Sequence, residues 1–484
     1  MKLKIVFGLL LCLVAFNLHA QNIGINDTGT DPESSAMLDV NSNSKGLLIP
    51  RMTSTERANI NLPANGLMVY DITSNTFWYY SSSEWREIGE GMDSNKLEDQ
   101  DADTRVEVEQ NPDEDIVRFT LDGTEYFRMD DFRLEVLNSL GSVVIGELAG
   151  DSLTTGARNI FIGSGAGRGN DTGFENTFIG FAAGEKNKGG VFNTFLGSTA
   201  GLNNTTGVAN TFLGDDSGLS NTSGEANTFV GDDAGLANIT GDRNVLLGQF
   251  AGRSNTGNDN VSVGTEAGFN LTGNASVQIG NQAGFFIGPG NQNVMVGHRS
   301  GTFADSSIAN VFIGYEAGIS AKADSSVIIG FQAGLFNNGP FNTYVGFQSG
   351  ANATTGAANT FLGFRSGINS SEGFNNVFLG VESGFSNTSG AQNTFVGVSS
   401  GGFNSTGNQN VFLGRAAGFS NTTGSHNVFL GGRSAAFHSV GSANTIIGFE
   451  AGANVDSDSL TIIGFQAGLD HQVTNSTLLG FQSG

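Results

Sequence analysis

The sequence has little that would serve thiol chemistry, polyanion binding or membrane insertion. Of 484 residues one is cysteine, six are proline, and 22 are lysine or arginine against 46 aspartate or glutamate, so the formal net charge is −24. Binding to nucleic-acid phosphates or to an anionic membrane surface needs clustered basic residues, and this balance argues against both. Charged residues make up only 14% and hydrophobic residues 38%, which is not typical of a disordered chain.

The single cysteine, Cys12, lies in a segment typical of secretion signals. Two lysines precede an apolar run over residues 5–18, and Ala20 offers a small residue for cleavage, so residues 1–20 are predicted to be a signal peptide. The leucines and apolar residues around Cys12 do not fit a lipid-attachment signal. The mature chain is then free of cysteine, and no later run of 18 or more apolar residues predicts a transmembrane helix. We expect export through the inner membrane to the cell surface, the outer membrane or the extracellular space.

A small β-rich module is predicted over residues 22–91. Apolar runs at 66–70, 76–80 and 84–88, separated by turn residues, predict a three-stranded antiparallel meander. One short helix is predicted over 53–60, because Thr53 can cap it and Glu56 stands three residues later. The aromatic residues Trp78, Tyr79, Tyr80 and Trp85 have two interpretations, a platform on which carbohydrate stacks or the core of this small module.

An acidic region follows at residues 92–139. Between residues 87 and 135 there are 17 acidic and five basic residues, and alternating apolar positions predict an antiparallel β module or a linker. Asp99, Asp101 and Asp103 form a D-x-D-x-D pattern that offers hard oxygen ligands to Ca²⁺. Thr104 stands at the glycine position of an EF-hand loop and Gln110 at the position of its bidentate glutamate. A solvated acidic linker is the alternative interpretation.

From residue 142 to residue 484 one motif recurs, Asn-(Thr/Val)-Phe-(Ile/Leu)-Gly-x-x-(Ala/Ser)-Gly-x-x-Asn-x-Thr-Gly-x-x. Its central glycine occurs 21 times at intervals of 16 or 17 residues. We number positions from this glycine: position −1 is Ile, Leu or Val in all 21 copies, −3 is Val, Thr or Ile in all 21, and +4 is Gly in 20. Such regularity identifies each copy as one structural unit.

The unit predicts an all-β fold, a parallel β-solenoid or β-roll of about 21 coils. Each copy has one strand and several glycine corners, and none has the amphipathic stretch of a helical repeat. Coils stacked about 4.8 Å apart give a rod of roughly 100 Å. Position −4 is Asn in 16 of 21 copies. This column either forms a ladder of side-chain amide hydrogen bonds or tolerates left-handed backbone at a corner.

The strand pattern also bears on assembly. Residues two apart in a strand share a face, so positions −3 and −1 are expected to point into the coil and position −2, which is Phe in 11 copies, to point out. Either this Phe stripe packs against other chains, or the rod is wide enough to hold it inside. The first alternative predicts a homotrimer along most of residues 142–484.

Residues 142–484 resemble the head repeats of YadA-type trimeric autotransporter adhesins, as in residues 210–218. That resemblance implies a left-handed β-roll of three chains around one axis, used for attachment to surfaces and matrix proteins. Residues 35–40 (SAMLDV) and 45–52 (KGLLIPRM) resemble N-terminal modules of secreted surface and tail-fibre-like proteins of Gram-negative bacteria, which implies no catalysis. The longer repeat, its phenylalanines and the lack of a stalk or β-barrel anchor depart from the adhesin family.

The sequence therefore predicts a protein without enzymatic activity and without a required cofactor. The four histidines of the repeat region, His298, His426, His438 and His471, stand at different repeat positions and form no catalytic pattern. The hypothesis is a cell-surface adhesin that attaches to surfaces, matrix proteins or glycans at many points. The alternative is a fibre shaft of tail-fibre type that spaces a binding or chaperone domain located elsewhere. Because the repeat stops without a cap, we expect the gene product to continue past Gly484.

Overall fold

The computed structural model describes residues 22–89, 96–99, 101–108, 116–130, 133–136, 140–470 and 474–484. The chain forms two units, Met1–Glu135 and Val136–Gly484. The predicted signal peptide at residues 1–20, Gln110 and His471 lie outside the described residues.

The first part of the N-terminal unit contains two small sheets. Strands β1 (Ile23–Asn26) and β2 (Leu38–Asn41) pair in parallel. A four-stranded sheet has the order β3-β4-β5-β6, formed by β3 (Arg51–Met52), β4 (Met68–Asp71), β5 (Thr76–Ser81) and β6 (Glu84–Glu87). Strands β4, β5 and β6 are the predicted antiparallel meander, and β3 adds to β4 in parallel.

The predicted helix is present but shorter. Helix α2 spans Ser54–Ala58, and Thr53 caps its N-terminus in a capping box with Glu56. The backbone N–H of Thr53 donates to Glu56 Oε2 at 2.8 Å, while the N–H of Glu56 donates to Thr53 Oγ1 at 3.3 Å. The Glu56 carboxylate accepts from the backbone and side chain of Thr53, which lowers its pKa. These local hydrogen bonds explain why so short a helix forms after an extended residue.

The acidic region folds as the predicted antiparallel module. It is a five-stranded sheet in the order β11-β10-β9-β8-β7. The strands are β7 (Lys96–Glu98), β8 (Arg105–Val108), β9 (Val117–Leu121), β10 (Thr124–Asp130) and β11 (Arg133–Val136). Asp122 and Gly123, both at positive φ, form the predicted turn between β9 and β10.

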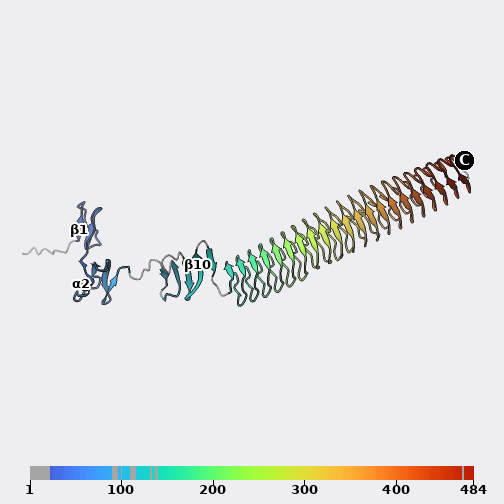
Figure 1. Ribbon diagram of the computed structural model, residues 1–484. Helices are drawn as coiled ribbons and strands as arrows, with labels where there is room; N and C mark the ends of the chain where they lie inside the picture. The colour runs from blue at the N-terminus through green and yellow to red at the C-terminus, as the bar shows by residue number, and fades with distance from the viewer. Residues whose placement is uncertain are drawn as a thin grey trace, which may run out of the picture. The chain divides into compact units, whose positions relative to one another are not determined.

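The repeat region is a parallel β-solenoid with one three-residue strand per copy. Its 21 strands lie side by side in chain order in a single sheet, seen from green to red in Figure 1. The strands are β12 (Val143–Ile145), β13 (Ile160–Ile162), β14 (Thr177–Ile179), β15 (Thr194–Leu196), β16 (Thr211–Leu213), β17 (Thr228–Val230), β18 (Val245–Leu247), β19 (Val261–Val263), β20 (Val277–Ile279), β21 (Val294–Val296), β22 (Val311–Ile313), β23 (Val327–Ile329), β24 (Thr343–Val345), β25 (Thr360–Leu362), β26 (Val377–Leu379), β27 (Thr394–Val396), β28 (Val411–Leu413), β29 (Val428–Leu430), β30 (Thr445–Ile447), β31 (Thr461–Ile463) and β32 (Thr477–Leu479). Like pairs with like, as Phe195 pairs with Phe212.

The expected direction of the phenylalanines is wrong. All 11 at position −2 are fully buried inside the coil, and positions −3 and −1 point outward and are partly exposed. The rings stack along the interior, with centroids 4.7 Å apart for Phe178 and Phe195 and 4.6 Å for Phe412 and Phe429. The reason is steric: a Cβ at Gly184, position +4, would lie 2.7 Å from the Phe178 ring, so the absence of a side chain there makes room for the ring. The Phe stripe therefore gives no reason for an oligomer.

The asparagines at position −4 form the predicted ladder. Asn176 Nδ2 donates to Asn159 Oδ1 at 3.2 Å and to the Gly190 carbonyl at 2.9 Å, and Asn176 Oδ1 accepts from the Asn193 N–H at 3.0 Å. The asparagines are buried, and the left-handed residue is the one before, such as Glu175 at φ 55°. The ladder, rather than tolerance of a left-handed corner, explains the column.

A second ladder was not anticipated. The asparagine at position +7 of the motif is buried, and Asn204 Nδ2 donates to Asn187 Oδ1 at 2.7 Å one coil away. Its signal was present in the repeated Asn of the motif. Between residues 271 and 321 this column is apolar instead, with Leu271, Ile287, Ala304 and Ala321 buried in it.

Candidate functional site

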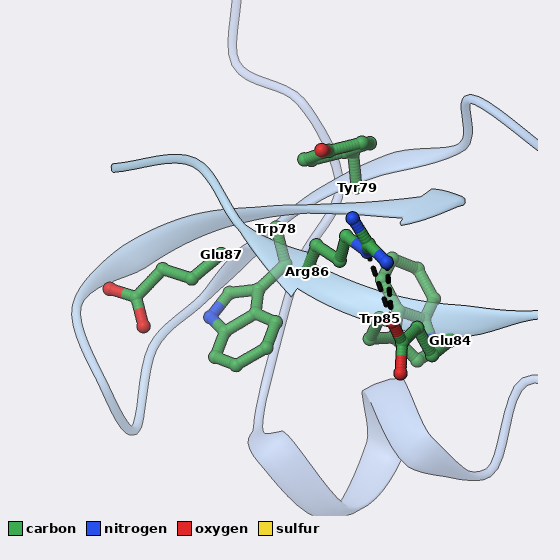
Figure 2. Close-up of a pocket in the computed structure, with 6 residues that line it drawn as sticks. All are labelled: Trp78, Tyr79, Glu84, Trp85, Arg86 and Glu87. Atoms are coloured by element: carbon green, nitrogen blue, oxygen red, sulfur yellow. Dashed lines mark hydrogen bonds and ion pairs between the residues drawn. The ribbon is translucent and has the colours of Figure 1, made fainter. Parts of the chain in front are cut away.

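A pocket of about 540 Å³ lies at the edge strand β6 of the four-stranded sheet. It is lined by Trp78, Tyr79, Glu84, Trp85, Arg86 and Glu87. Figure 2 shows Trp78 and Trp85 on one side of the strands and Tyr79 on the other. Arg86 donates to Glu84 Oε1 through Nε at 3.0 Å and Nη2 at 2.7 Å, an interaction that raises the pKa of Arg86.

The four aromatic residues do not form one platform. Trp78, Tyr80 and Trp85 share a face, since Tyr80 pairs with Trp85 across the strands and their rings meet edge to face at 5.5 Å. The Arg57 guanidinium of α2 lies 3.5 Å from the centroid of the Trp78 ring. It covers a face of the indole on which a sugar would stack, so the geometry favours the packing interpretation.

A buried ion pair holds that arginine in place. Arg57 Nε donates to Asp71 Oδ2 at 2.9 Å, and Asp71 is fully buried. Burial alone would raise the pKa of Asp71, but hydrogen bonds from Ser54, from the Thr73 backbone and from Arg57 outweigh it and lower the pKa to about 2. The group is therefore structural: it joins α2 to β4 and carries no proton that could be transferred near neutral pH.

The structure brings the three predicted calcium ligands together between β7 and β8. Carboxylate oxygens of Asp99, Asp101 and Asp103 lie within 4.8 Å of one another. A hydrogen bond with Asp99 and the charge of Asp103 raise the pKa of Asp101. Burial would raise the pKa of Asp99, but it is lowered by hydrogen bonds, the first from the Thr104 backbone. Exposed carboxylates also cluster without a metal, so Ca²⁺ binding stays a prediction.

Apolar exposure is the most unusual property of the N-terminal unit. Among its described side chains Val69 is the only fully buried hydrophobic residue. Ile23, Leu48, Leu62 and Leu97 are 61%, 76%, 90% and 77% exposed. Modules of this size need a core, a staple or a partner, and residues 22–135 contain no cysteine. The described part of the unit therefore leaves much of its apolar surface uncovered.

Among the described histidines only His438 is fully buried. It replaces the asparagine of the second ladder, is fully buried, and lies with Nε2 2.8 Å from Asn444 Nδ2 and Nδ1 3.2 Å from Asp456 Oδ1. Burial lowers its pKa to about 4, against the opposing charges of Asp456 and Asp458. Neutral His438 therefore substitutes for an amide in the ladder.

Comparison with known proteins identifies one region. Residues 24–102 match the family described as the phage tail like trimerisation region, which is not a catalytic family. No curated protein matches the chain. None of the helices in the described residues is long and apolar enough to cross a bilayer. The chain thus combines a region similar to a trimerisation region of phage-tail type with a long parallel β-solenoid.

Proposed function

We propose that this protein is an exported homotrimeric fibre that acts as an adhesin on the cell surface. The trimer is supported mainly by the exposed apolar surface of the N-terminal unit. Its exposed apolar residues lie largely within residues 24–102, the region that resembles a phage tail trimerisation region. Three copies would supply the core that one copy lacks.

The solenoid suits display rather than chemistry. Its coils are 16 or 17 residues long throughout, so no long loop builds a catalytic cleft over them. A trimeric rod presents the same surface many times, and repeated weak contacts gain strength through multivalency. Attachment to surfaces, matrix proteins or glycans uses this property directly.

Light scattering of the mature chain, residues 21–484, tests the trimer. We expect three times the mass of a single chain. Replacing Leu47 and Leu48 together by Ser should shift the mass toward a single chain, because both are exposed in one copy within the matched region. The matched control is Ile239→Ser, at a residue 51% exposed on the solenoid. A single-chain mass for the parent would overturn the proposal.

Binding measurements test the adhesin role. Fluorescent mature chain should bind to at least one set of immobilised glycans, matrix proteins or abiotic surfaces, and the Leu47→Ser/Leu48→Ser variant should bind more weakly through loss of multivalency. The regular coils equally fit the alternative, a fibre shaft that spaces a separate binding or chaperone domain. Retained trimers that bind none of these surfaces would favour the shaft over the adhesin.

A further inference from the structure

The outward face of the solenoid sheet is free of charged strand residues along its whole length, and its position −3 is Thr in ten copies. Position −1 is Ile, Leu or Val in all 21 strands, and position −3 is Val, Thr or Ile, so neither column contains a charged residue. Leu196, Leu362 and Leu479 at position −1 are 46%, 50% and 64% exposed. Parallel sheets normally have both faces covered, and here the phenylalanines cover only the inner one.

Aromatic residues widen this face in part of the solenoid. The backbone ladder continues past the central glycine: the Gly163 N–H donates to the Ile145 carbonyl and the Gly165 N–H to the Glu147 carbonyl, both at 2.8 Å. Position +1 follows a bend at this glycine, where φ is 130° at Gly163, and its side chains form a further column next to the strand. From β22 to β27 this column is apolar in six consecutive coils, Tyr315, Phe331, Phe347, Phe364, Val381 and Val398, each 41–46% exposed. Phe449, Phe465 and Phe481 repeat the pattern after β30, β31 and β32.

The widened face has the anatomy of an interface. Its aromatic rings are already stacked in one copy, with centroids 5.1 Å apart for Phe331 and Phe347, so little side-chain entropy remains to be lost. Position +2 beside it is a polar rim of charged and amide side chains. Arg299 pairs with Glu316 at 3.1 Å and Arg433 with Glu450 at 2.9 Å. A central apolar strip with a polar rim is typical of specific protein interfaces.

We propose that this outward face, positions −3, −1 and +1, is covered by the same face of other copies of this chain, packed most closely along β22–β27 and β30–β32. The inference rests on the proposed trimer and assigns its contact surface in the solenoid. A row of rings repeating every coil is matched in spacing by another row with the same repeat. Copies held together at residues 24–102 would begin their solenoids at the same residue. Equivalent rings of neighbouring copies would then lie at the same height along the solenoid.

The size of the face is sufficient. The nine coils of β22–β27 and β30–β32 extend over roughly 43 Å, and positions −3 to +1 span roughly 16 Å. The close contact alone therefore offers on the order of 700 Å², near the value of about 800 Å² per partner in a standard interface, and the remaining coils add to it. Asp215 and Asp232 occupy position +1 in the N-terminal half. Three copies would bring like charges together there, so we assign the close contact to the aromatic coils instead.

Single-cysteine cross-linking of the mature chain tests this assignment, because removal of residues 1–20 leaves no native cysteine. Phe347→Cys on the outward face is compared with Phe403→Cys, a residue 48% exposed at position +6. Treatment with a short bismaleimide should give covalent dimers at Phe347→Cys at least tenfold faster than at Phe403→Cys. Asp232→Cys should fall well below Phe347→Cys.

A second measurement separates this inference from the proposed function. If light scattering shows a trimer but Phe347→Cys cross-links no faster than Phe403→Cys, the inference is overturned and the trimer stands. If the parent is a single chain, both fail. Replacing Phe331, Phe347 and Phe364 together by Ser should speed hydrogen exchange on β23–β25, whereas Phe403→Ser with Phe437→Ser should not. Equal exchange in the two variants would also contradict the inference, since in an isolated copy both sets are exposed.

Discussion

The solenoid buries an apolar interior of its own in two clusters, whereas the described part of the N-terminal unit has one fully buried hydrophobic residue, Val69. The solenoid unit is only 16 or 17 residues, too short for a core, yet each Phe at position −2 is covered by the coils before and after it. The N-terminal sheets have no repeated neighbour in the same chain. The comparison shows that repetition supplies a core that the N-terminal sheets do not build from one copy of the chain.

The solenoid itself is not uniform. Phe161 to Phe229 stack in one buried cluster and Met295 to Ile462 belong to another. Between them position −2 holds Ser262 and Gln278, whose side chains meet at 3.0 Å inside the coil. In a stack where coils contact only their neighbours, such a break weakens the coupling between the parts on either side.

The largest effect is expected from charge placed in the Phe stack. Phe212→Asp with Phe229→Asp would bury two carboxylates a coil apart, because both rings are fully buried. We expect the coils around β16 and β17 to unfold. The free energy of unfolding, measured by urea denaturation, should fall by well over 4 kcal/mol. Asp215→Ala with Asp232→Ala, at nearby outward positions, is the control. Denaturation midpoints that match for the two variants would place the rings outside after all.

Removal of one ladder asparagine should cost less. Asn376 Nδ2 donates to Asn359 Oδ1 at 3.1 Å and to the Gly390 carbonyl at 2.8 Å, and Asn376 Oδ1 accepts from the Asn393 N–H at 2.9 Å. Asn376→Ala leaves these buried groups unsatisfied, which should lower the free energy of unfolding by about 2–4 kcal/mol. Asn352→Ala, in an exposed amide pair, should change stability by less than about 0.5 kcal/mol. Urea denaturation of both variants measures the difference.

His438 makes one coil sensitive to acid. Its pKa is lowered to about 4 in the folded state from an ordinary value of 6.5. Between these pH values the unfolded chain binds a proton that the folded chain does not. The free energy of unfolding is therefore highest above pH 6.5, falls by on the order of 3 kcal/mol as the pH drops toward 4, and is constant below that pH. His438→Asn, which restores the ladder residue, should remove this dependence. Hydrogen exchange over residues 425–460 at pH 7 and pH 5 measures it, and parallel profiles would contradict the assignment.

The sequence was sufficient for the repeat and for the strand in each copy, because both depend on periodicity alone. It left the asparagine column open between a ladder and a left-handed corner, and the hydrogen bonds of the structure decide for the ladder. It was insufficient for the direction of the side chains. Positions −2 and −1 are both apolar in 19 of 21 copies and position −3 is Val, Ile or Thr, so alternation does not say which set faces inward. The discriminating signal is the pairing of Phe at −2 with Gly at +4: a Cβ at Gly201 would lie 2.5 Å from the Phe195 ring.

In the N-terminal unit the local structure could be predicted from the sequence, but the packing of its apolar side chains could not. Its hairpins and the Thr53 capping box follow from local residues and were predictable, since turns and caps depend on a few neighbours. The lack of an internal core was not, because runs such as Leu47-Leu48 resemble buried strands in sequence. Only their exposure in the folded single chain shows that the small sheets leave them uncovered.

The smallest effect is expected from repairing the break between the two clusters. Gln278 is fully buried, and its Nε2 has no hydrogen-bond partner in the described structure. Gln278→Met with Ser262→Ala keeps the shape at position 278, removes the unsatisfied donor together with the Ser262 hydroxyl that donates to Gln278 Oε1, and places a thioether next to Met295, which follows in the same column. We expect a gain of about 1 kcal/mol and slower hydrogen exchange on β19 and β20, because an unmade buried hydrogen bond costs about 1–3 kcal/mol. Phe312→Met, within the intact stack, is the matched control and should lower stability, since it leaves ring volume unfilled. If both variants lowered the urea midpoint alike, the contacts of Gln278 would outweigh its unsatisfied amide. The two halves of the solenoid would then already be coupled as firmly as the coils of the Phe stack.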